Sequence, residues 1–253
     1  MERTLSFRDQ AGHRVCAILA TPPAETSRLV LLCHGFLSNK NSTTNKTLTR
    51  LLLEHGIATL RFDFFGQGES EGPFEALTVG TALDQTMRAL ESAKSMNYQR
   101  LGLIGSSFGG LVAVLTAAGR TELAALGLKC PVPDFPEMLR LEFGEAGIAR
   151  WRQRDEIPDL TGGMHPIRLR FAFYESCLAY EGYKAAEAVH APALIVQGDA
   201  DEYVPLHQSR RLLEALKSEK ELRILHGADH GFTKAEDFRT MTTLLAEWMF
   251  RHL

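Results

Sequence analysis

Short runs of apolar residues alternate with longer segments of mixed polarity along most of the chain. Apolar runs with the length of buried strands cover residues 29–33, 58–63, 100–105, 123–128, 193–197 and 222–225. The segments between them have the length of helices, and several place leucines at steps of three and four residues, as at Leu48, Leu51 and Leu52. Alternating strands and helices are typical of a mainly parallel central sheet with helices on both faces. We therefore predict an α/β fold.

The first twenty residues follow a different pattern. The apolar stretches 5–7 and 15–19 flank residues 9–12, whose sequence Asp-Gln-Ala-Gly is typical of a turn. This pattern predicts an antiparallel hairpin at one edge of the sheet.

Residues 132–189 break the alternation. They contain Pro158, Pro166 and the pair Gly162-Gly163 among many charges, and no clean strand pattern. We predict a small helical cap, inserted between the strand that ends at Leu128 and the strand that begins at Ala193. About 55 residues would bury little core alone, so we predict a single domain over 1–253 with an inserted cap subdomain over 132–189. Aromatic side chains of this segment either line a pocket or, more commonly, pack the cap onto the sheet; they include Phe135, Phe143, Trp151, Phe173 and Tyr174.

Composition narrows the classes of partner. The 253 residues are 45% hydrophobic and 23% charged, as in ordinary globular proteins, and Lys+Arg of 28 against Asp+Glu of 31 gives a net charge of −3. Because the chain lacks a basic footprint, we expect no nucleic-acid partner. No apolar run approaches the ~20 residues that span a bilayer, and the N-terminus lacks the apolar stretch of a secretory signal. We expect no membrane span and a cytoplasmic location, although a form whose signal had been removed would look the same.

The cysteines and histidines indicate neither a disulfide framework nor a metal site. Cys16, Cys33, Cys130 and Cys177 are scattered, with no CxxC pair, and no His/Cys cluster has the spacing of metal ligands. We expect no metal and no organic cofactor. The sequence leaves the oligomeric state unknown.

The strongest chemical signal is the segment Gly105-Ser106-Ser107-Phe108-Gly109, which matches G-x-S-x-G. It follows a predicted strand and precedes a predicted helix, the context in which a sharp turn exposes a nucleophilic serine. Only Ser107 has glycine two residues before and two residues after it. We therefore predict that Ser107 is a nucleophile.

A serine hydroxyl needs a base to accept its proton, and His230 is the best-placed histidine. It lies in the loop after the last predicted strand, and such loops gather at the carboxyl edge of a parallel sheet together with Ser107. His226 shares the loop, but it follows its strand directly and is expected near the sheet edge. His34 also follows a strand, and its ring and backbone are expected to shape the site.

A carboxylate is needed to hold the histidine in its working tautomer. The loop after the fifth predicted strand offers Asp199, Asp201 and Glu202. Asp134 is a rival without matching sequence context, and Asp229 is adjacent to His230 and would have difficulty reaching its ring. From the residues alone, the choice among the acids of the Asp199–Glu202 loop stays open.

Four segments in order resemble the α/β-hydrolase superfamily: His34-Gly35-Phe36, Gly105-Ser-Ser-Phe-Gly109, Gly198-Asp-Ala-Asp201 with Val204-Pro205, and Ala228-Asp-His230. The resemblance runs from about residue 29 to the C-terminus. The family's loop pattern G-x-x-D-x-x-V-P implies that Asp201 is the acid and Asp199 a turn residue. The family also implies an oxyanion hole formed by the backbone N–H groups of Phe36 and Phe108.

A further segment, Arg61-Phe-Asp-Phe-Phe-Gly-Gln-Gly-Glu-Ser70, resembles a family turn that supports the oxyanion loop. Together with the short insertion and the length, this segment is similar to compact capped esterases of the cinnamoyl or feruloyl type. The elbow departs from those relatives, because it reads Ser-Ser-Phe where they commonly have His-Ser-Gln. That difference lies beside the nucleophile and puts the identity of the substrate in doubt.

The sequence thus predicts a serine carboxylic-ester hydrolase that forms an acyl-enzyme with small aryl or acyl esters. The alternatives on the same triad are a thioesterase, a monoacylglycerol lipase and an aminopeptidase-type amide hydrolase. A rival from another class is a non-catalytic ligand receptor on the same scaffold.

Overall fold

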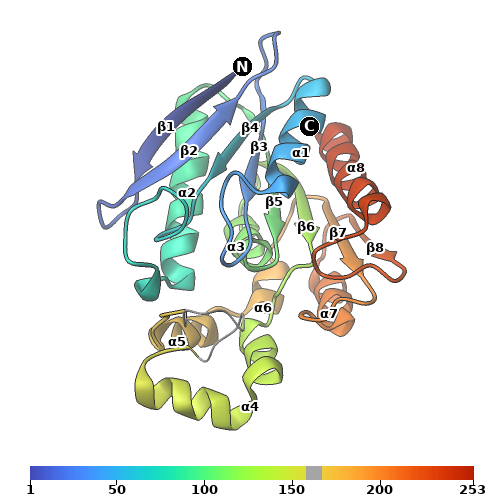
Figure 1. Cartoon of the computed structure of the whole chain (residues 1–253). Helices are drawn as coiled ribbons and strands as arrows, with labels where there is room; N and C mark the ends of the chain where they lie inside the picture. The colour runs from blue at the N-terminus through green and yellow to red at the C-terminus, as the bar shows by residue number, and fades with distance from the viewer. Residues whose placement is uncertain (158–166) are drawn as a thin grey trace.

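The computed structural model describes residues 1–157 and 167–253. Its centre is an eight-stranded sheet in the order β1-β2-β4-β3-β5-β6-β7-β8 (Figure 1). The strands are β1 (Glu2–Arg8), β2 (Arg14–Ala20), β3 (Arg28–Cys33), β4 (Ala58–Phe62), β5 (Arg100–Ser106), β6 (Leu123–Lys129), β7 (Ala193–Gly198) and β8 (Lys220–Leu225). From β4 to β8 the neighbouring strands are parallel, which confirms the predicted mainly parallel sheet.

The predicted hairpin is confirmed at the sheet edge. β1 and β2 pair in antiparallel register from Glu2 opposite Ala20 to Arg8 opposite Arg14. β2 then pairs antiparallel with β4, so the hairpin continues the sheet at the side opposite β8.

Helices cover both faces of the sheet, as predicted. The helices of the core are α1 (Thr43–Glu54), α2 (Val79–Ser95), α3 (Phe108–Ala117), α7 (Leu206–Ala215) and α8 (Ala235–His252). Apolar side chains of α1 and α8 form one buried cluster with one face of the sheet, and those of α2, α3 and α7 belong to a second cluster on the other face. A strand such as β3 buries residues on both faces, which explains its unbroken apolar run.

In the described part of the segment between β6 and β7 there are three further helices: α4 (Phe135–Arg154), α5 (Ala172–Ala179) and α6 (Gly182–Ala186). In Figure 1, α4 and α5 lie beyond the carboxyl ends of the parallel strands. α4 changes direction at Gly144, whose φ of 63° lies in the left-handed region. The prolines and glycines noted above at 158, 162, 163 and 166 fall outside the described residues. The cap subdomain over 132–189 stays a prediction, and these helices agree with it.

The aromatic residues of this segment mostly pack. Trp151 and Phe173 have no exposed surface, and the Trp151 indole N–H donates to the Leu169 carbonyl over 2.8 Å. The ring of Phe173 lies 5.8 Å from that of Phe108 at the start of α3. Contacts between aromatic rings therefore join the helices between β6 and β7 to the core.

Candidate active site

Ser107 occupies the sharp turn between β5 and α3. Its backbone has φ 53° and ψ −116°, a strained combination for a residue with a side chain. The turn is fixed because the Ser107 N–H donates to the Lys129 carbonyl over 2.9 Å, and the Gly110 N–H donates to the Ser107 carbonyl over 2.8 Å. The surrounding structure thus maintains a conformation that the local chain would not adopt alone.

Glycine is required at both positions of the motif because a side chain would not fit at either one. A Cβ on Gly105 would lie 2.2 Å from the Gly109 carbonyl oxygen, and a Cβ on Gly109 would lie 2.4 Å from the carbonyl oxygens of Cys33 and His34. The start of α3 therefore approaches the ends of β3 and β5 more closely than any side chain permits.

The structure brings together Asp201 and His230. The His230 Nδ1 lies 2.9 Å and 3.0 Å from the two carboxylate oxygens of Asp201, whose side chain is 1% exposed. Asp201 also accepts the backbone N–H groups of Tyr203 and Val204 at 3.0 Å and 2.8 Å. Burial acts to raise the pKa of Asp201, but these bonds and the nearby His230 outweigh it and hold the pKa below its ordinary value.

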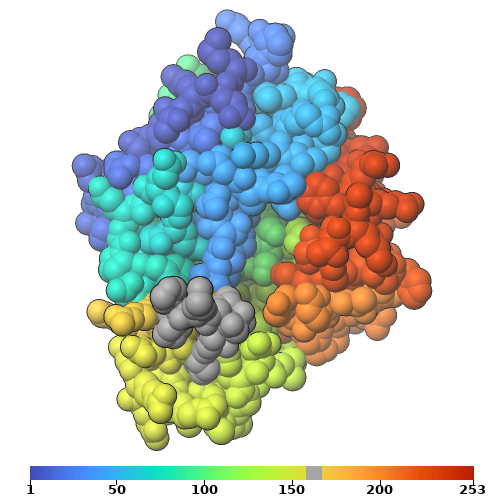
Figure 2. All heavy atoms as spheres, viewed as in Figure 1, coloured from blue at the N-terminus to red at the C-terminus, as the bar shows by residue number. Residues whose placement is uncertain are grey.

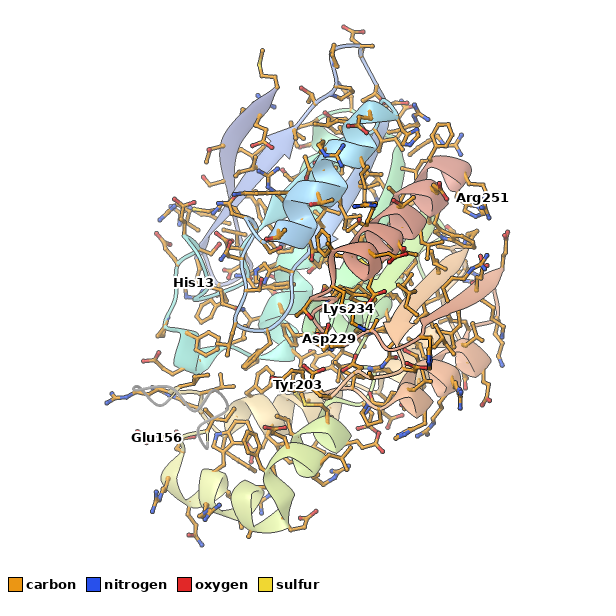
Figure 3. The ribbon with its side chains drawn as sticks, turned by 45° about the vertical axis from the view of Figure 1, so that its right-hand side comes forward. His13, Glu156, Tyr203, Asp229, Lys234 and Arg251 are labelled. Carbon is orange, nitrogen blue, oxygen red and sulfur yellow. The ribbon has the colours of Figure 1, made fainter. Side chains whose placement is uncertain are left out.

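The loops that carry this pair lie side by side at the carboxyl edge of the sheet. Figure 3 labels Tyr203 and Asp229, which mark the loops after β7 and β8, between the sheet and α4. The rings of Tyr203 and His230 lie 5.4 Å apart. Sequence positions nearly thirty residues apart are thus adjacent, because parallel strands end at the same edge.

The other acidic residues considered as partners of His230 make contacts elsewhere. Asp199 accepts the Gly227 N–H at 2.6 Å and lies 2.8 Å from the exposed ring of His226, at the end of the edge strand β8. Asp229 accepts the Thr233 N–H at 2.8 Å instead of bonding to the adjacent His230. Asp134 caps α4 by accepting the Glu137 N–H at 2.9 Å.

Phe36 and Phe108, the two residues that the family resemblance implies as oxyanion donors, lie close together. Phe36 follows β3 and Phe108 begins α3, and their rings lie 6.1 Å apart. Among the described residues, no backbone carbonyl accepts the N–H of Phe36 or of Phe108. Both donors are therefore available to a ligand.

His34 stabilises the loop that carries Phe36. Its Nε2 accepts the Phe64 N–H at 3.0 Å, which leaves the proton on Nδ1 to be donated to the Gly35 carbonyl at 2.8 Å. Burial lowers the pKa of His34 from 6.5 to about 4, because the charged ring would lose its hydration. The neutral imidazole thus connects the loop after β3 to the chain after β4.

A buried ion pair supports the same loop. The Lys40 ammonium contacts the Asp63 carboxylate, and the Lys40 N–H donates to Asp63 at 2.6 Å. Asp63 also accepts the Glu69 N–H at 2.8 Å. These contacts agree with the supporting turn that the sequence predicts, whereas the role of Lys40 had no sequence signal.

Two cavities meet at Ser107, Phe36 and His230. One, of about 240 Å³, is mainly apolar and has walls that include Phe135, Met138, Leu139, Val132 and Val204. The other, of about 190 Å³, is more polar, with walls that include Ser38, Ser42, Thr44, Asn45 and Lys129. In the space-filling view, green atoms of the central part of the chain appear in a recess between blue and red segments (Figure 2).

Lys129 and Cys130 are site neighbours that the sequence analysis missed. Lys129 is 6% exposed, and its ammonium donates to the His230 carbonyl over 2.7 Å. The only signal was a lysine at the end of a buried strand. Within the described residues, the one group of potential metal ligands comprises Cys130, Asp201 and His230. It suits a cation poorly, because burial raises the pKa of the Cys130 thiol and keeps it protonated.

None of the described helices is both long enough and apolar enough to cross a bilayer.

The chain is similar in sequence and in fold to several known proteins. The structure of Est1E from Butyrivibrio proteoclasticus with ferulic acid bound is 25% identical, covers 98% of each chain and has a TM-score of 0.84. The uncharacterized 31.7 kDa protein of the traX-finO intergenic region of Escherichia coli is 24% identical, over 89% of this chain and 91% of the relative. The mitochondrial palmitoyl-protein thioesterase ABHD10 of Pongo abelii is 22% identical, over 84% and 70% of the two chains.

A family model for alpha/beta hydrolases matches residues 30–239, which include both cavities' shared residues and the predicted triad. The chain belongs to the alpha/beta hydrolase family.

Proposed function

We propose that this hydrolase is a serine carboxylic-ester hydrolase that acts through an acyl-enzyme on small aryl or acyl esters. The observation that carries the proposal is the common cavity wall of Ser107 and His230, with Asp201 bonded to the far nitrogen of His230. A serine at a strained elbow, a histidine and a buried carboxylate are the parts of a nucleophilic triad.

Ser107 Oγ attacks the ester carbonyl, and His230 Nε2 accepts the serine proton, because Nδ1 is bonded to Asp201. The oxyanion accepts the N–H groups of Phe36 and Phe108. His230 then donates its proton to the departing alcohol. Water next attacks the acyl-enzyme while His230 accepts one of its protons, and His230 returns that proton to the Ser107 oxygen as the acid leaves. Each oxyanion donor is expected to contribute about 2.7–4 kcal/mol to the transition state.

The apolar cavity favours a small aryl or acyl group. Its volume of about 240 Å³ and its phenylalanine, methionine and leucine walls fit an aromatic or short aliphatic chain next to Ser107. The likeness to Est1E, which binds ferulic acid, supports an aryl acid as the acyl part. We infer that residues 132–189 serve as the cap, because Phe135, Met138 and Leu139 of α4 supply part of this wall.

Thioester hydrolysis is a second candidate. The relative ABHD10 is a palmitoyl-protein thioesterase, and thioesters pass through the same tetrahedral intermediate and acyl-enzyme. The proposed triad would act on oxygen and sulfur leaving groups alike, so the relative rates on matched esters and thioesters decide between the two functions.

A panel of aryl esters, short acyl esters, thioesters and peptides tests the proposal. We expect hydrolysis of the esters to fall by at least ~10³-fold in Ser107→Ala. Ser106→Ala is the matched control, because Ser106 is adjacent to Ser107 but ends β5 and contributes only to the polar cavity, so hydrolysis of esters with small neutral alcohols should be retained. Equal rates in Ser107→Ala and the unaltered protein would refute the proposal, and so would no hydrolysis of any member by the unaltered protein.

A further inference from the structure

The polar cavity beside Ser107 is built differently from the apolar one. Its walls come from the loop after β3, the first turn of α1, the ends of β5 and β6, and the loop after β8. Ser42 is the N-cap of α1, and its hydroxyl oxygen accepts the Asn45 N–H at 3.2 Å. The first turn of α1 contains no acidic residue, so the positive end of the helix dipole is uncompensated there.

Lys129 places a positive charge in this cavity. Its ammonium donates one proton to the His230 carbonyl and lies 5.3 Å from the centre of the Phe232 ring. In the described part of the chain, no carboxylate lies within ion-pair distance of it. An ammonium has three N–H donors and is costly to bury without an anion, so Lys129 retains donors for a ligand.

Asn45 provides an independent observation. Its residue is 3% exposed, and its side-chain Nδ2 has no hydrogen-bond partner within residues 1–157 and 167–253. Asn45 is also part of the cavity wall, and buried amide nitrogens are nearly always bonded, so a small shift of this side chain would offer an unused donor to an acceptor in the cavity. The cavity thus combines an ammonium, a primary amide and a helix N-terminus, all of which attract anionic oxygen.

The charge at the other cavity has the opposite sign. Glu142 is exposed and contributes to the wall of the apolar cavity. An anionic group would be repelled there and attracted to Lys129. The hydrogen bond from Lys129 to the carbonyl of His230 also places the ammonium beside the residue that protonates the departing alcohol.

We propose that the polar cavity binds an anionic oxygen group, carboxylate or phosphate, carried by the alcohol part of the substrate. This inference rests on the proposed ester hydrolysis and adds its leaving-group class: hydroxy acids or phosphorylated alcohols esterified with an apolar acid. The volume of about 190 Å³ suits a short fragment, equivalent to roughly six water molecules. The apolar acid occupies the other cavity, and the scissile carbonyl lies at Ser107 between them.

Three esters of 3-phenylpropanoic acid test the proposal, because they share the acyl part and differ only in the alcohol part. The butyl ester is neutral, the 3-carboxypropyl ester carries a carboxylate, and the 3-phosphonooxypropyl ester carries a phosphate. We expect the two anionic esters to exceed the butyl ester in kcat/KM by about tenfold to hundredfold, because charged hydrogen bonds have that effect. The difference should lie mainly in KM. The relative rates of the carboxylate and phosphate esters identify which anion fits.

Lys129→Met should abolish most of this preference, measured as the ratio of anionic to neutral kcat/KM. Lys129→Arg should restore part of it. Lys46→Met is the matched control, because it removes the same charge from an exposed position next to Asn45 and should leave the ratio unchanged. If Lys129→Met does not fold, the ratio of anionic to neutral kcat/KM is measured in Asn45→Ala instead, where we expect it to fall several-fold. A purely structural role of Lys129 would lower all three rates equally, and this result would overturn the inference.

Binding without turnover separates the inference from the proposed function. In Ser107→Ala, calorimetry should detect the binding of 4-hydroxybutanoate. In the double variant that also carries Lys129→Met, this binding should be weaker by about tenfold or more. Ester hydrolysis that depends on Ser107 but shows no preference for the anionic leaving groups would overturn the inference and leave the proposed function intact. Anion binding that depends on Lys129, without any hydrolysis by the unaltered protein, would refute the proposed function alone.

Discussion

Asp201 is expected to act on the reaction through His230. In Asp201→Asn the carboxylate no longer accepts the Nδ1 proton, and the imidazole loses the tautomer that exposes a basic Nε2. We predict that kcat falls by about 10³–10⁴-fold while KM changes little, as measured by steady-state hydrolysis of an aryl ester. Asp199→Asn is the control, because Asp199 contacts His226 and Gly227, and a comparable loss there would argue against Asp201 as the acid.

Gly109 tests the close approach at the elbow. Gly109→Ala would place a Cβ 2.4 Å from two backbone carbonyl oxygens. We therefore predict that the free energy of unfolding falls by at least ~2 kcal/mol and that hydrolytic activity is lost as well. Gly119→Ala is the comparison, because its φ is +70° but no atom lies within 4 Å of the added Cβ. It should cost only the left-handed strain of about 1–2 kcal/mol and leave activity intact. Chemical denaturation measures both, and equal losses of activity would contradict the steric explanation.

At the residue scale, the sequence predicted local geometry where a motif specifies it. G-x-S-x-G between a strand and a helix predicted a sharp turn at Ser107, and the structure has that turn between β5 and α3; the role of Ser107 as nucleophile stays a prediction. Lys129 could not be found in this way. Its importance depends on the carbonyl of His230, which lies 101 residues further along the chain and meets the end of β6 only after the sheet has formed.

Among the elements, the loop after β3 depends on the buried pair of Lys40 and Asp63. The Lys40 side chain is 2% exposed and that of Asp63 is fully buried, so Asp63→Asn leaves a buried ammonium with only the exposed Glu69. We predict a loss of about 3 kcal/mol in the free energy of unfolding. Glu69→Gln should cost less than ~1 kcal/mol, since that side chain is 70% exposed.

A double-mutant cycle with Lys40→Met separates the pair from its neighbours. The double variant should lose less stability than the sum of the two single variants, because each single change leaves a buried charge unpaired. Additive losses, measured by urea unfolding, would show that the two side chains do not interact.

The element order and the mainly parallel character of the sheet followed from the hydrophobic pattern, because parallel strands buried on both faces leave continuous apolar runs such as β3 and β7. The order of the strands within the sheet was not predicted. The structure of the cap was harder to predict from the sequence. α4 has no clear apolar stripe, since buried and exposed residues are mixed along it, and it bends at Gly144. No sequence pattern distinguishes the aromatic residue that lines the cavity from those that only pack, so the sequence could not single out Phe135.

At the scale of the whole molecule, His34 is expected to make folding sensitive to acid. The folded chain lowers the pKa of His34 from 6.5 to about 4, so the unfolded chain binds the proton at higher pH. Stability from this group is therefore fully present above about pH 6.5 and is lost as the pH falls toward 4, with a total near 3 kcal/mol. His34→Gln should make the free energy of unfolding less steep over this range, and an unchanged slope would contradict a buried neutral ring.

The central claim is that Ser107 is the nucleophile of an acyl-transfer site assembled from distant parts of one sheet. The most direct measurement is treatment of the whole protein with an organophosphonate, followed by intact mass and peptide mapping. We predict one adduct per chain, on Ser107, formed at a rate that falls sharply in His230→Ala. Labelling at another residue, or no labelling while esters are still hydrolysed, would contradict the claim.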